Sequence, residues 1–180
     1  LEWELDKSLL LPKDRKNALR KIHAIINPKL NPPNLFLDAL AKQTTIEFEN
    51  LLEDALASIE NGVRGLAFSS GLAATDCLLR MFKAGDEIIA MDDLYGGTYR
   101  LFTRLYKDSG IKFHFVSMAD PEALSSLVNE RTKMVWVETP TNPMMNIIDL
   151  KAMARFSKKH GLLLAVDNTF ASPYLQNPLD

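Results

Sequence analysis

From residue 66 onward, short apolar runs alternate along the chain with longer segments of helical pattern. The apolar runs have the length of buried strands, and they are LAFSS at 66–70, EIIAM at 87–91, KFHFV at 112–116, KMVWVE at 133–138 and LLLAVD at 162–167. The helical patterns lie between them, near 71–83, 97–109, 120–129 and 149–160. This alternation is typical of βαβ units, so we predict an α/β fold with a mostly parallel sheet and flanking helices.

The last of these helices has clear start and stop signals. Asp149 is placed to cap its N-terminus, and Gly161 is placed to end it. Lys158 and Lys159 lie in the final turn, where the negative end of the helix dipole favours cations.

The first 46 residues have a different character, because four prolines interrupt them and their apolar residues show no long periodicity. We interpret residues 1–46 as an arm or linker, with one helix from Arg15 to Ile26 followed by the extended stretch NPKLNPPN. Residues 47–61 form an amphipathic pattern that Gly62 would close. The main domain is therefore expected to span residues 47–180. The start at leucine and the stop at NPLD suggest a fragment or a processed chain.

Composition narrows the class of protein. With 180 residues, 47% of them hydrophobic, the chain is long enough to bury a core. Its net charge of -2 and its scattered basic residues give no reason to expect a nucleic-acid partner. No apolar stretch approaches the roughly 20 residues of a membrane span, and no signal peptide is evident. A single cysteine, Cys77, fits a reducing cytoplasmic setting, and it lies in a helical pattern that predicts a buried thiol. The three histidines share no metal-ligand spacing, so no metal is expected.

Ligands of parallel α/β sheets bind outside the carboxyl ends of the strands, so the residues that follow each predicted strand are the candidates for chemistry. These positions carry the polar residues, which read SSGLAA at 69–74, MDDLYGGT at 91–98, VETPTNP at 137–143 and VDNTF at 166–170.

Two of these stretches offer groups for a flat, phosphorylated ligand. Ser70 and Gly71 lead into a helix whose first backbone N–H groups would face the crevice and suit a phosphate, but taken alone these residues favour a serine N-cap with a tight glycine turn. Tyr95 precedes two glycines, so its ring would either lie over a planar ligand or pack as an aromatic lid on the sheet edge.

The other two stretches contribute carboxylates and an amide. Glu138 and Asn142 flank a proline-rich turn. Each also has a purely structural explanation, because Glu138 could pair with an arginine and Asn142 could be a turn residue. Asp167 ends a buried strand, where a carboxylate must be hydrogen-bonded or paired. It would hold the nitrogen of a pyridine ring protonated, with Thr169 supporting the ring, or else it would act as a turn carboxylate.

The chain resembles the pyridoxal-phosphate (PLP) enzymes of cysteine and methionine metabolism. The resemblance covers residues 50–180, and five ordered motifs carry it: LLEDALASIENG, AFSSGLAAT, AGDEIIAMDDLYGGTYRLF, VWVETPTNP and LAVDNTFASPYLQNPL. It implies the large cofactor-binding domain of the type I PLP-dependent transferase fold, here truncated. It also implies PLP as cofactor, with Gly71 and Leu72 beside Ser70 at its phosphate and Tyr95 stacked on its ring. Asn142 would lie near its phenolic oxygen and Asp167 at its nitrogen, with Thr169 and Glu138 in support.

Within the family the likeness is strongest to the cystathionine γ-lyases. It implies a C–S lyase of trans-sulfuration that converts cystathionine to cysteine, 2-oxobutanoate and ammonia, in a cytoplasmic tetramer of close dimers. Gly97 argues against the methionine γ-lyases, which resemble this stretch but have cysteine there. The alternatives that stay open are γ-replacement, as in cystathionine γ-synthase, and a non-catalytic product that keeps the fold without turnover.

Two departures from the family pattern matter. The family has Tyr-Ser-Arg and Asn-Pro-Thr where residues 41–49 read AKQTTIEFE, so phosphate contacts to a neighbouring subunit are not implied here. The Schiff-base lysine of the family belongs to a Ser-x-x-Lys stretch that is expected beyond Asp180. We therefore assign no catalytic base within this chain, and only Tyr95 a supporting role.

Overall fold

The computed structural model describes residues 35–180, and it places side chains from residue 45 onward. The helix predicted at 15–26 and the linker after it lie outside the described residues. The chain divides into two compact units, residues 1–54 and 55–180. The first described element, α2, runs from Leu35 to Ile59, and so begins 12 residues before the predicted start at residue 47. The division into an arm of residues 1–46 and a domain of residues 47–180 stays a prediction.

The end of α2 also differs in detail from the prediction. Asn61, not Gly62, takes the left-handed conformation that ends the helix, with φ of 55°. The N–H of Gly62 donates to the carbonyl of Ala57 at 2.8 Å, as in a Schellman motif. Asparagine is the residue other than glycine that tolerates this backbone best, because its side chain is short and polar.

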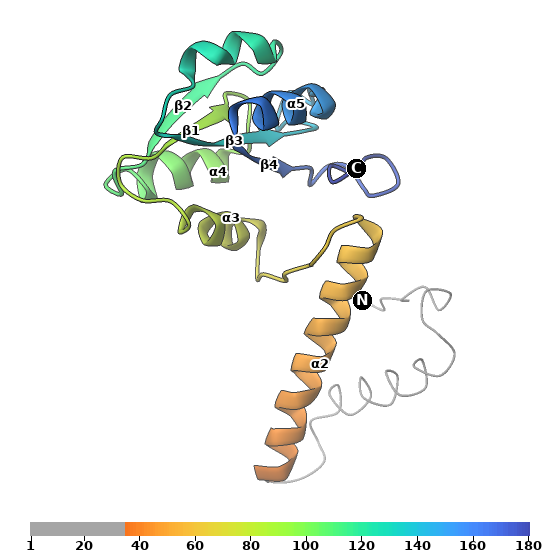
Figure 1. Ribbon diagram of the computed structural model, residues 1–180. Coiled ribbons are helices and arrows are strands. Elements are labelled where there is room, and N and C mark those ends of the chain that lie inside the picture. The colour runs from red at the N-terminus through yellow and green to blue at the C-terminus, as the bar shows by residue number, and fades with distance from the viewer. Residues whose placement is uncertain (1–34) are drawn as a thin grey trace. The chain divides into compact units, whose positions relative to one another are not determined.

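The unit of residues 55–180 is built around a four-stranded parallel sheet (Figure 1). Its strands are β1 (Glu87–Met91), β2 (Lys112–Val116), β3 (Thr132–Glu138) and β4 (Leu163–Asp167), in the order β2-β1-β3-β4. All three neighbouring pairs are parallel, and the register sets Ala90 opposite both Phe115 and Trp136. The predicted α/β class and parallel sheet are confirmed, and four of the five predicted strands are present at the expected positions.

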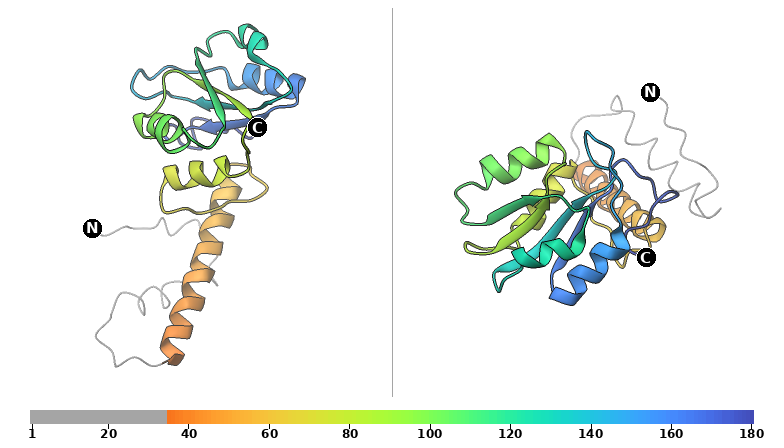
Figure 2. Two further views of the ribbon diagram at one scale, coloured as in Figure 1. Left: turned by 90° about the vertical axis from the view of Figure 1, so that its left-hand side faces the viewer. Right: turned by 90° about the horizontal axis from the view of Figure 1, so that it is seen from above.

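Helices cover both faces of the sheet (Figure 2). The segment α4 (Gly96–Arg100), which continues as a π-helix over Leu101–Leu105, lies on one face. The 3-10 helix Pro121–Leu127 and α5 (Leu150–His160) lie on the other. The remaining helix, α3 (Gly71–Leu79), contacts α4. Of the predicted signals on α5, both ends are confirmed, because Asp149 accepts a hydrogen bond from the Ala152 N–H at 2.9 Å and Gly161 has φ of 66°.

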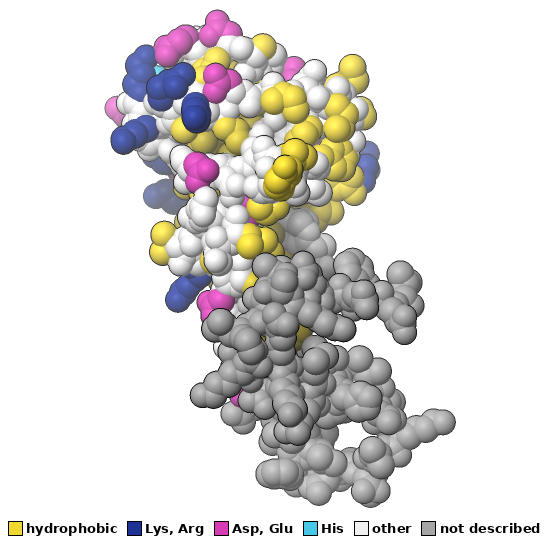
Figure 3. All heavy atoms as spheres, turned by 90° about the vertical axis from the view of Figure 1, so that its right-hand side faces the viewer, with side chains coloured by type: hydrophobic (Ala, Val, Ile, Leu, Met, Phe, Trp, Pro, Cys, Tyr) yellow, Lys and Arg dark blue, Asp and Glu magenta, His cyan; other side chains and the backbone are white. Residues whose placement is uncertain are grey.

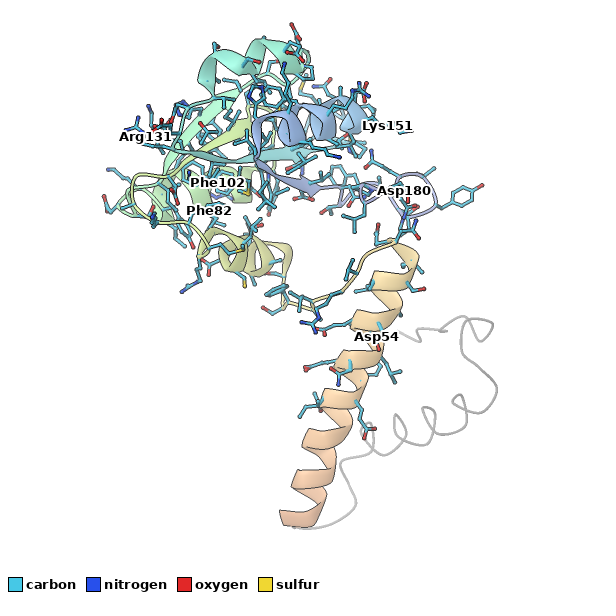
Figure 4. The ribbon with its side chains drawn as sticks, in the orientation of Figure 1. Asp54, Phe82, Phe102, Arg131, Lys151 and Asp180 are labelled. Carbon is cyan, nitrogen blue, oxygen red and sulfur yellow. The ribbon has the colours of Figure 1, made fainter. Side chains whose placement is uncertain are left out.

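The core lies in the two central strands. Ile88, Ile89 and Ala90 of β1 are fully buried, as are Met134, Val135 and Val137 of β3, because helices exclude water from both faces of the sheet. On the α4 side, the ring of Phe102 stacks on Phe113 at a centroid distance of 4.6 Å and meets Trp136 edge-on at 5.6 Å. Figure 4 shows Phe102 beneath the sheet. None of the described helices is both long and apolar enough to cross a bilayer.

Two sequence predictions are wrong. The run at 66–70 is not a strand, and Leu66 and Phe68 are 63% and 42% exposed. An apolar run becomes a strand only when a neighbour supplies backbone partners, and none of the described strands pairs with it. Cys77 is exposed, not buried. The buried residues of α3 are Thr75 and Leu79, one turn apart, and Cys77 falls midway between them on the opposite side of the helix.

A buried carboxylate lies at the opposite end of β1 from the strand exits. Glu87 is only 2% exposed, and its two oxygens contact Arg131 Nη2 at 2.7 Å, His114 Nε2 at 2.6 Å and Asn129 Nδ2 at 3.1 Å. The hydrogen bond from His114, helped by Asn129 and by the nearby charge of Arg131, lowers the pKa of Glu87 from 4.5 to about 2. This group joins the start of β1, the middle of β2 and the segment before β3.

We predict that the buried carboxylate of Glu87 makes the free energy of unfolding depend on pH in the acidic range. Because its folded-state pKa is depressed, the carboxylate stabilises the fold fully above its ordinary pKa of 4.5, and this contribution is lost as the pH falls toward 2. Glu87→Gln should lower the free energy of unfolding at neutral pH and flatten its slope between those limits. Urea unfolding at a series of pH values measures both effects.

Glu122→Gln is the matched control, because Glu122 pairs with Lys159 at 3.1 Å but is 70% exposed. Exposed pairs contribute little, so this variant should keep the wild-type slope. If the free energy of unfolding of Glu87→Gln changes with pH as steeply as that of the wild type, the stabilising role of the Glu87 carboxylate is contradicted.

Candidate active site

A cavity of about 360 Å³ opens at the carboxyl ends of β1, β3 and β4, a volume within the range of small-molecule sites. It lies wholly within the unit of residues 55–180. Its lining residues are Ser70, Gly71, Leu72, Thr75, Tyr95, Thr98, Glu138, Pro140, Asn142, Asp167, Thr169 and Phe170. The sequence prediction that Ser70, Tyr95, Asn142 and Asp167 would gather in one pocket is confirmed, whereas the role of each residue toward a ligand stays a prediction.

The N-terminus of α3 forms one end of the cavity. Ser70 caps the helix, because its Oγ accepts a hydrogen bond from the Ala73 N–H at 3.1 Å. The N–H groups of Gly71 and Leu72 make no hydrogen bond within the described part of the chain. A Cβ on Gly71 would meet nothing within 4 Å, so space remains in front of them. Free donors at the positive end of a helix dipole suit a phosphate group.

Tyr95 lies at the start of α4 and is tied to the opposite wall. Its N–H donates to Glu138 Oε2 at 2.9 Å. Its ring folds back over Gly97, so a Cβ at residue 97 would overlap the ring. Glycine at this position therefore fixes where the aromatic face of Tyr95 lies. Tyr95 is 44% exposed and lines the cavity, as a stacking residue requires.

Glu138 ends β3 and is 4% exposed. Burial raises its pKa, and the nearby charges of Asp167 and Asp93 raise it further. The N–H groups of Tyr95 and Asn142 act in the opposite direction, because they stabilise the charged form. The carboxyl group of Glu138 thus holds two segments of the cavity wall, the one that carries Tyr95 and the one that carries Asn142.

Asp167 ends β4, directly opposite Glu138 in the sheet register. Its Oδ1 accepts hydrogen bonds from the Thr169 N–H at 3.1 Å and the Thr169 hydroxyl at 2.6 Å. No described residue donates to Oδ2, so this oxygen remains available at a half-buried position in the cavity. A protonated ring nitrogen would be a complementary donor.

Four lining residues were not identified from the sequence: Thr75, Thr98, Pro140 and Phe170. Two of them could have been identified from helical spacing, because residues three or four positions apart share a helix face. Thr75 lies four residues after Gly71, and Thr98 three after Tyr95, so each shares a helix face with a predicted residue. Thr75 donates to the Gly71 carbonyl at 2.9 Å, and Thr98 is only 1% exposed. Pro140 and Phe170 are neighbours of predicted residues and carry no separate signal.

The cavity combines an anion site, an aromatic face and an available carboxylate. Free N–H groups at α3, the ring of Tyr95 and Oδ2 of Asp167 are the donors and acceptors that the phosphate, ring and pyridine nitrogen of PLP require, so the residues present fit that cofactor. No lysine is among the lining residues. Within residues 35–180, no cluster of three histidine, cysteine, aspartate or glutamate side chains is suited to a metal ion.

Comparison with known proteins agrees with this geometry. The family described as Cys/Met metabolism PLP-dependent enzyme matches residues 44–180. A cystathionine γ-synthase/O-acetylhomoserine (thiol)-lyase of Bacillus subtilis is 55% identical over 130 residues, which are 72% of this chain and 35% of that protein. The cystathionine γ-lyase of Homo sapiens is 47% identical over 131 residues, 72% of this chain and 32% of that protein.

Solved structures show the same fold. The crystal structure of metB from Corynebacterium glutamicum matches with a TM-score of 0.68 and 46% identity, over 71% of this chain and 34% of that one. A cystathionine γ-lyase from Lactobacillus plantarum, complexed with L-serine, matches with a TM-score of 0.68 and 45% identity, over 69% and 33%. The chain spans about a third of the length of the relatives that it matches. Its fold is part of the PLP-binding α/β domain that these enzymes share.

Proposed function

Because this chain belongs to the family of Cys/Met metabolism PLP-dependent enzymes, we propose that it is the cofactor-binding part of a trans-sulfuration enzyme that breaks the C–S bond at the γ-carbon of cystathionine. The products of this γ-elimination are cysteine, 2-oxobutanoate and ammonia. One observation carries the proposal: the unpaired oxygen of Asp167 and the free N–H groups at α3 border the same cavity.

When bound, PLP supplies a protonated pyridine ring that withdraws electrons from the substrate carbon. The residues of this chain hold the cofactor in place. The N–H groups of Gly71 and Leu72 bind the phosphate, and the ring of Tyr95 covers one face. Asp167 keeps the ring nitrogen protonated, because a carboxylate at hydrogen-bond distance stabilises the charged form.

Two further residues orient Asp167 and Tyr95, and a third is assigned to the cofactor itself. Thr169 fixes Asp167 through two hydrogen bonds to one oxygen, so the other oxygen points to the ligand. Glu138 holds the N–H of Tyr95 at 2.9 Å. Asn142 borders the cavity with its amide, which we assign to the phenolic oxygen of the cofactor.

The test of this function uses the polypeptide at the full length that its gene encodes. It is supplied with PLP and cystathionine, and 2-oxobutanoate and cysteine are measured as products. Formation of both, in equal amounts and dependent on PLP, supports γ-elimination. Failure to form either product from cystathionine would contradict it.

A second candidate is γ-replacement, in which a sulfur nucleophile displaces a group from the γ-carbon of an activated homoserine. The 55% identity to the Bacillus subtilis enzyme favours this candidate. The two reactions are separated by incubation of the polypeptide with O-acetylhomoserine and cysteine. Cystathionine as the major product would favour replacement, and 2-oxobutanoate from cystathionine would favour elimination.

We also propose that the whole protein is a cytoplasmic homo-oligomer, a tetramer of close dimers. Large apolar side chains remain exposed in the unit of residues 55–180, and Figure 3 shows apolar side chains gathered on one face. Those with the largest exposure near the end of the chain are Tyr174, Leu175 and Leu179. Exposed apolar surface of this kind favours association. Light scattering on the purified polypeptide measures its molecular mass.

We predict that Gly97→Ala weakens PLP binding without unfolding the protein. The added methyl group overlaps the ring of Tyr95, and that ring is a side chain which can rotate away. Loss of the stacking surface should weaken PLP binding by about five- to tenfold, which corresponds to the free energy that an aromatic pair typically contributes. Gly96→Ala is the matched control, because a Cβ there meets only the flexible end of Arg100 at 3.4 Å. Equal PLP affinity for the two variants would contradict this role of Gly97.

A further inference from the structure

A cluster of three polar side chains lies behind the cavity wall and is not used by the proposed function. Oδ2 of Asp93 accepts hydrogen bonds from the hydroxyl of Thr141 and from Asn146 Nδ2, the latter at 3.1 Å. The Thr141 Oγ1 in turn accepts from the Asn146 N–H at 2.9 Å. These bonds connect residues that are about 50 positions apart in the sequence. We call Asp93, Thr141 and Asn146 the loop clamp.

The clamp joins the two loops that carry Tyr95 and Asn142. Asp93 follows β1, two residues before Tyr95, and Thr141 immediately precedes Asn142. Pro140 and Asn142 both line the cavity, whereas Thr141 between them does not and is fully buried. Alternate residues of this loop therefore face opposite ways: Asn142 toward the ligand, and Thr141 toward Asp93.

The loop that contains Thr141 is also closed upon itself. The Thr141 N–H donates to the Asn146 carbonyl, and the Met145 N–H donates to the Thr141 carbonyl, both at 3.0 Å. Residues 141–146 thus form a compact turn whose attachment to the β1 loop runs through the side chain of Asp93. Glu138 at the end of β3 supplies a second connection, because its carboxyl group accepts from the Tyr95 N–H at 2.9 Å and from the Asn142 N–H.

We propose that Asp93 is a positioning residue for the cofactor site. It acts through Thr141 and Asn146 to set the distance between the ring of Tyr95 and the amide of Asn142 across the cavity. This inference rests on the proposed function, since it assigns both of those side chains to PLP. Asp93 itself does not border the cavity and contacts no ligand.

Two substitutions at residue 93 separate a role in positioning the loops from a role of the negative charge. Asp93→Ala removes the acceptor for both hydrogen bonds, so the two loops lose the connection through Asp93 and keep the one through Glu138. Asp93→Asn keeps one oxygen that can accept them and removes only the charge. A clamp that acts by position therefore predicts that Asn restores what Ala loses, whereas a purely electrostatic role predicts that the two variants behave alike.

The first experiment measures PLP affinity in the full chain. Trp136 is buried two residues before Glu138 on the same face of β3, so its fluorescence reports binding, and Trp3→Phe removes the other tryptophan. Asp93→Ala should weaken PLP binding about tenfold, the effect of losing a charge-assisted, partly buried connection. Asp93→Asn should stay within about twofold of the parent. Asp108→Ala, which removes an exposed carboxylate without a side-chain hydrogen bond in the described chain, is the control and should not change affinity.

A double-mutant cycle shows whether Asp93 acts through Asn142. Once Asn142 is replaced by Ala, the further change Asp93→Ala should weaken PLP binding less than it does in the parent, because the side chain that it positions is gone. Thr141→Val removes only the hydroxyl and should reproduce the effect of Asp93→Ala. It serves as the second variant if Asp93→Ala lowers the melting temperature strongly.

Hydrogen exchange tests the clamp without any cofactor. In Asp93→Ala, the N–H groups of Asn146 and Tyr95 should exchange about tenfold faster than in the parent. If exchange accelerates but PLP affinity does not change, the positioning role is wrong. Additive effects in the cycle, or equal losses for Asp93→Asn and Asp93→Ala, would also overturn it. If the parent chain itself does not bind PLP while exchange still accelerates, the proposed function fails, and the cofactor role of the clamp fails with it.

Discussion

In the polypeptide at the full length that its gene encodes, replacing Asp167 with Asn should weaken PLP binding and lower turnover by roughly tenfold to a hundredfold while the fold is retained. The amide has nearly the size of the carboxylate, and its oxygen still accepts the two hydrogen bonds from Thr169, so packing is preserved. The change places an NH₂ group where Oδ2 faced the cavity. That group cannot stabilise a protonated ring nitrogen, and the lost charge-assisted hydrogen bond is worth about 1.5–3 kcal/mol.

PLP affinity, thermal melting and steady-state rates are compared for the two proteins. Asp149→Asn is the matched control, because Asp149 caps α5 away from the cavity and asparagine caps helices about as well as aspartate. It should leave affinity and rate unchanged. Wild-type affinity and turnover in a well-folded Asp167→Asn protein would mean that this carboxylate is structural.

Borohydride treatment of the 180-residue chain with PLP should produce no stable adduct at any one lysine. Covalent attachment requires an amine within bonding distance of the cofactor carbonyl, and no lysine lines the cavity. Lys83 and Lys107 follow helices and are not among the lining residues, and Lys158 and Lys159 lie in the last turn of α5. The cofactor should therefore be held noncovalently, and dialysis should remove it.

Mass measurement after proteolysis distinguishes the outcomes. Low, scattered modification of many surface lysines agrees with the account. A stoichiometric adduct on a single lysine of this chain would contradict it, and the position of that lysine would identify the base that we assign to no residue here.

Most of the strands and helices are predictable from the sequence, because the spacing of hydrophobic residues reflects which positions are buried. EIIAM and KFHFV form strands at the predicted residues, since short runs rich in β-branched or aromatic residues favour strands. LAFSS has the same appearance but lacks a partner strand, and pairing is not a local property. α2 begins earlier than predicted because the apolar residues before residue 47 show no long periodicity from which a helix could be inferred.

The candidate site was predictable to the extent that it follows strand ends. All eight predicted side chains border one cavity, because parallel strands bring their carboxyl ends to one edge. The supporting groups were not found from the sequence. The sequence carries no local signal for Asp93 or Glu87, because their partners are 27 to 53 positions away and only the three-dimensional structure brings them together.

The central claim is that this cavity holds PLP with Asp167 at its ring nitrogen. The most direct test is the ¹⁵N chemical shift of PLP labelled at the pyridine nitrogen, recorded with the chain at a pH where the ring nitrogen of free PLP is unprotonated. The account predicts the shift of a protonated nitrogen with the wild-type chain, and its loss with Asp167→Asn. An unprotonated nitrogen in the wild-type complex, or a protonated one in both complexes, would contradict the claim.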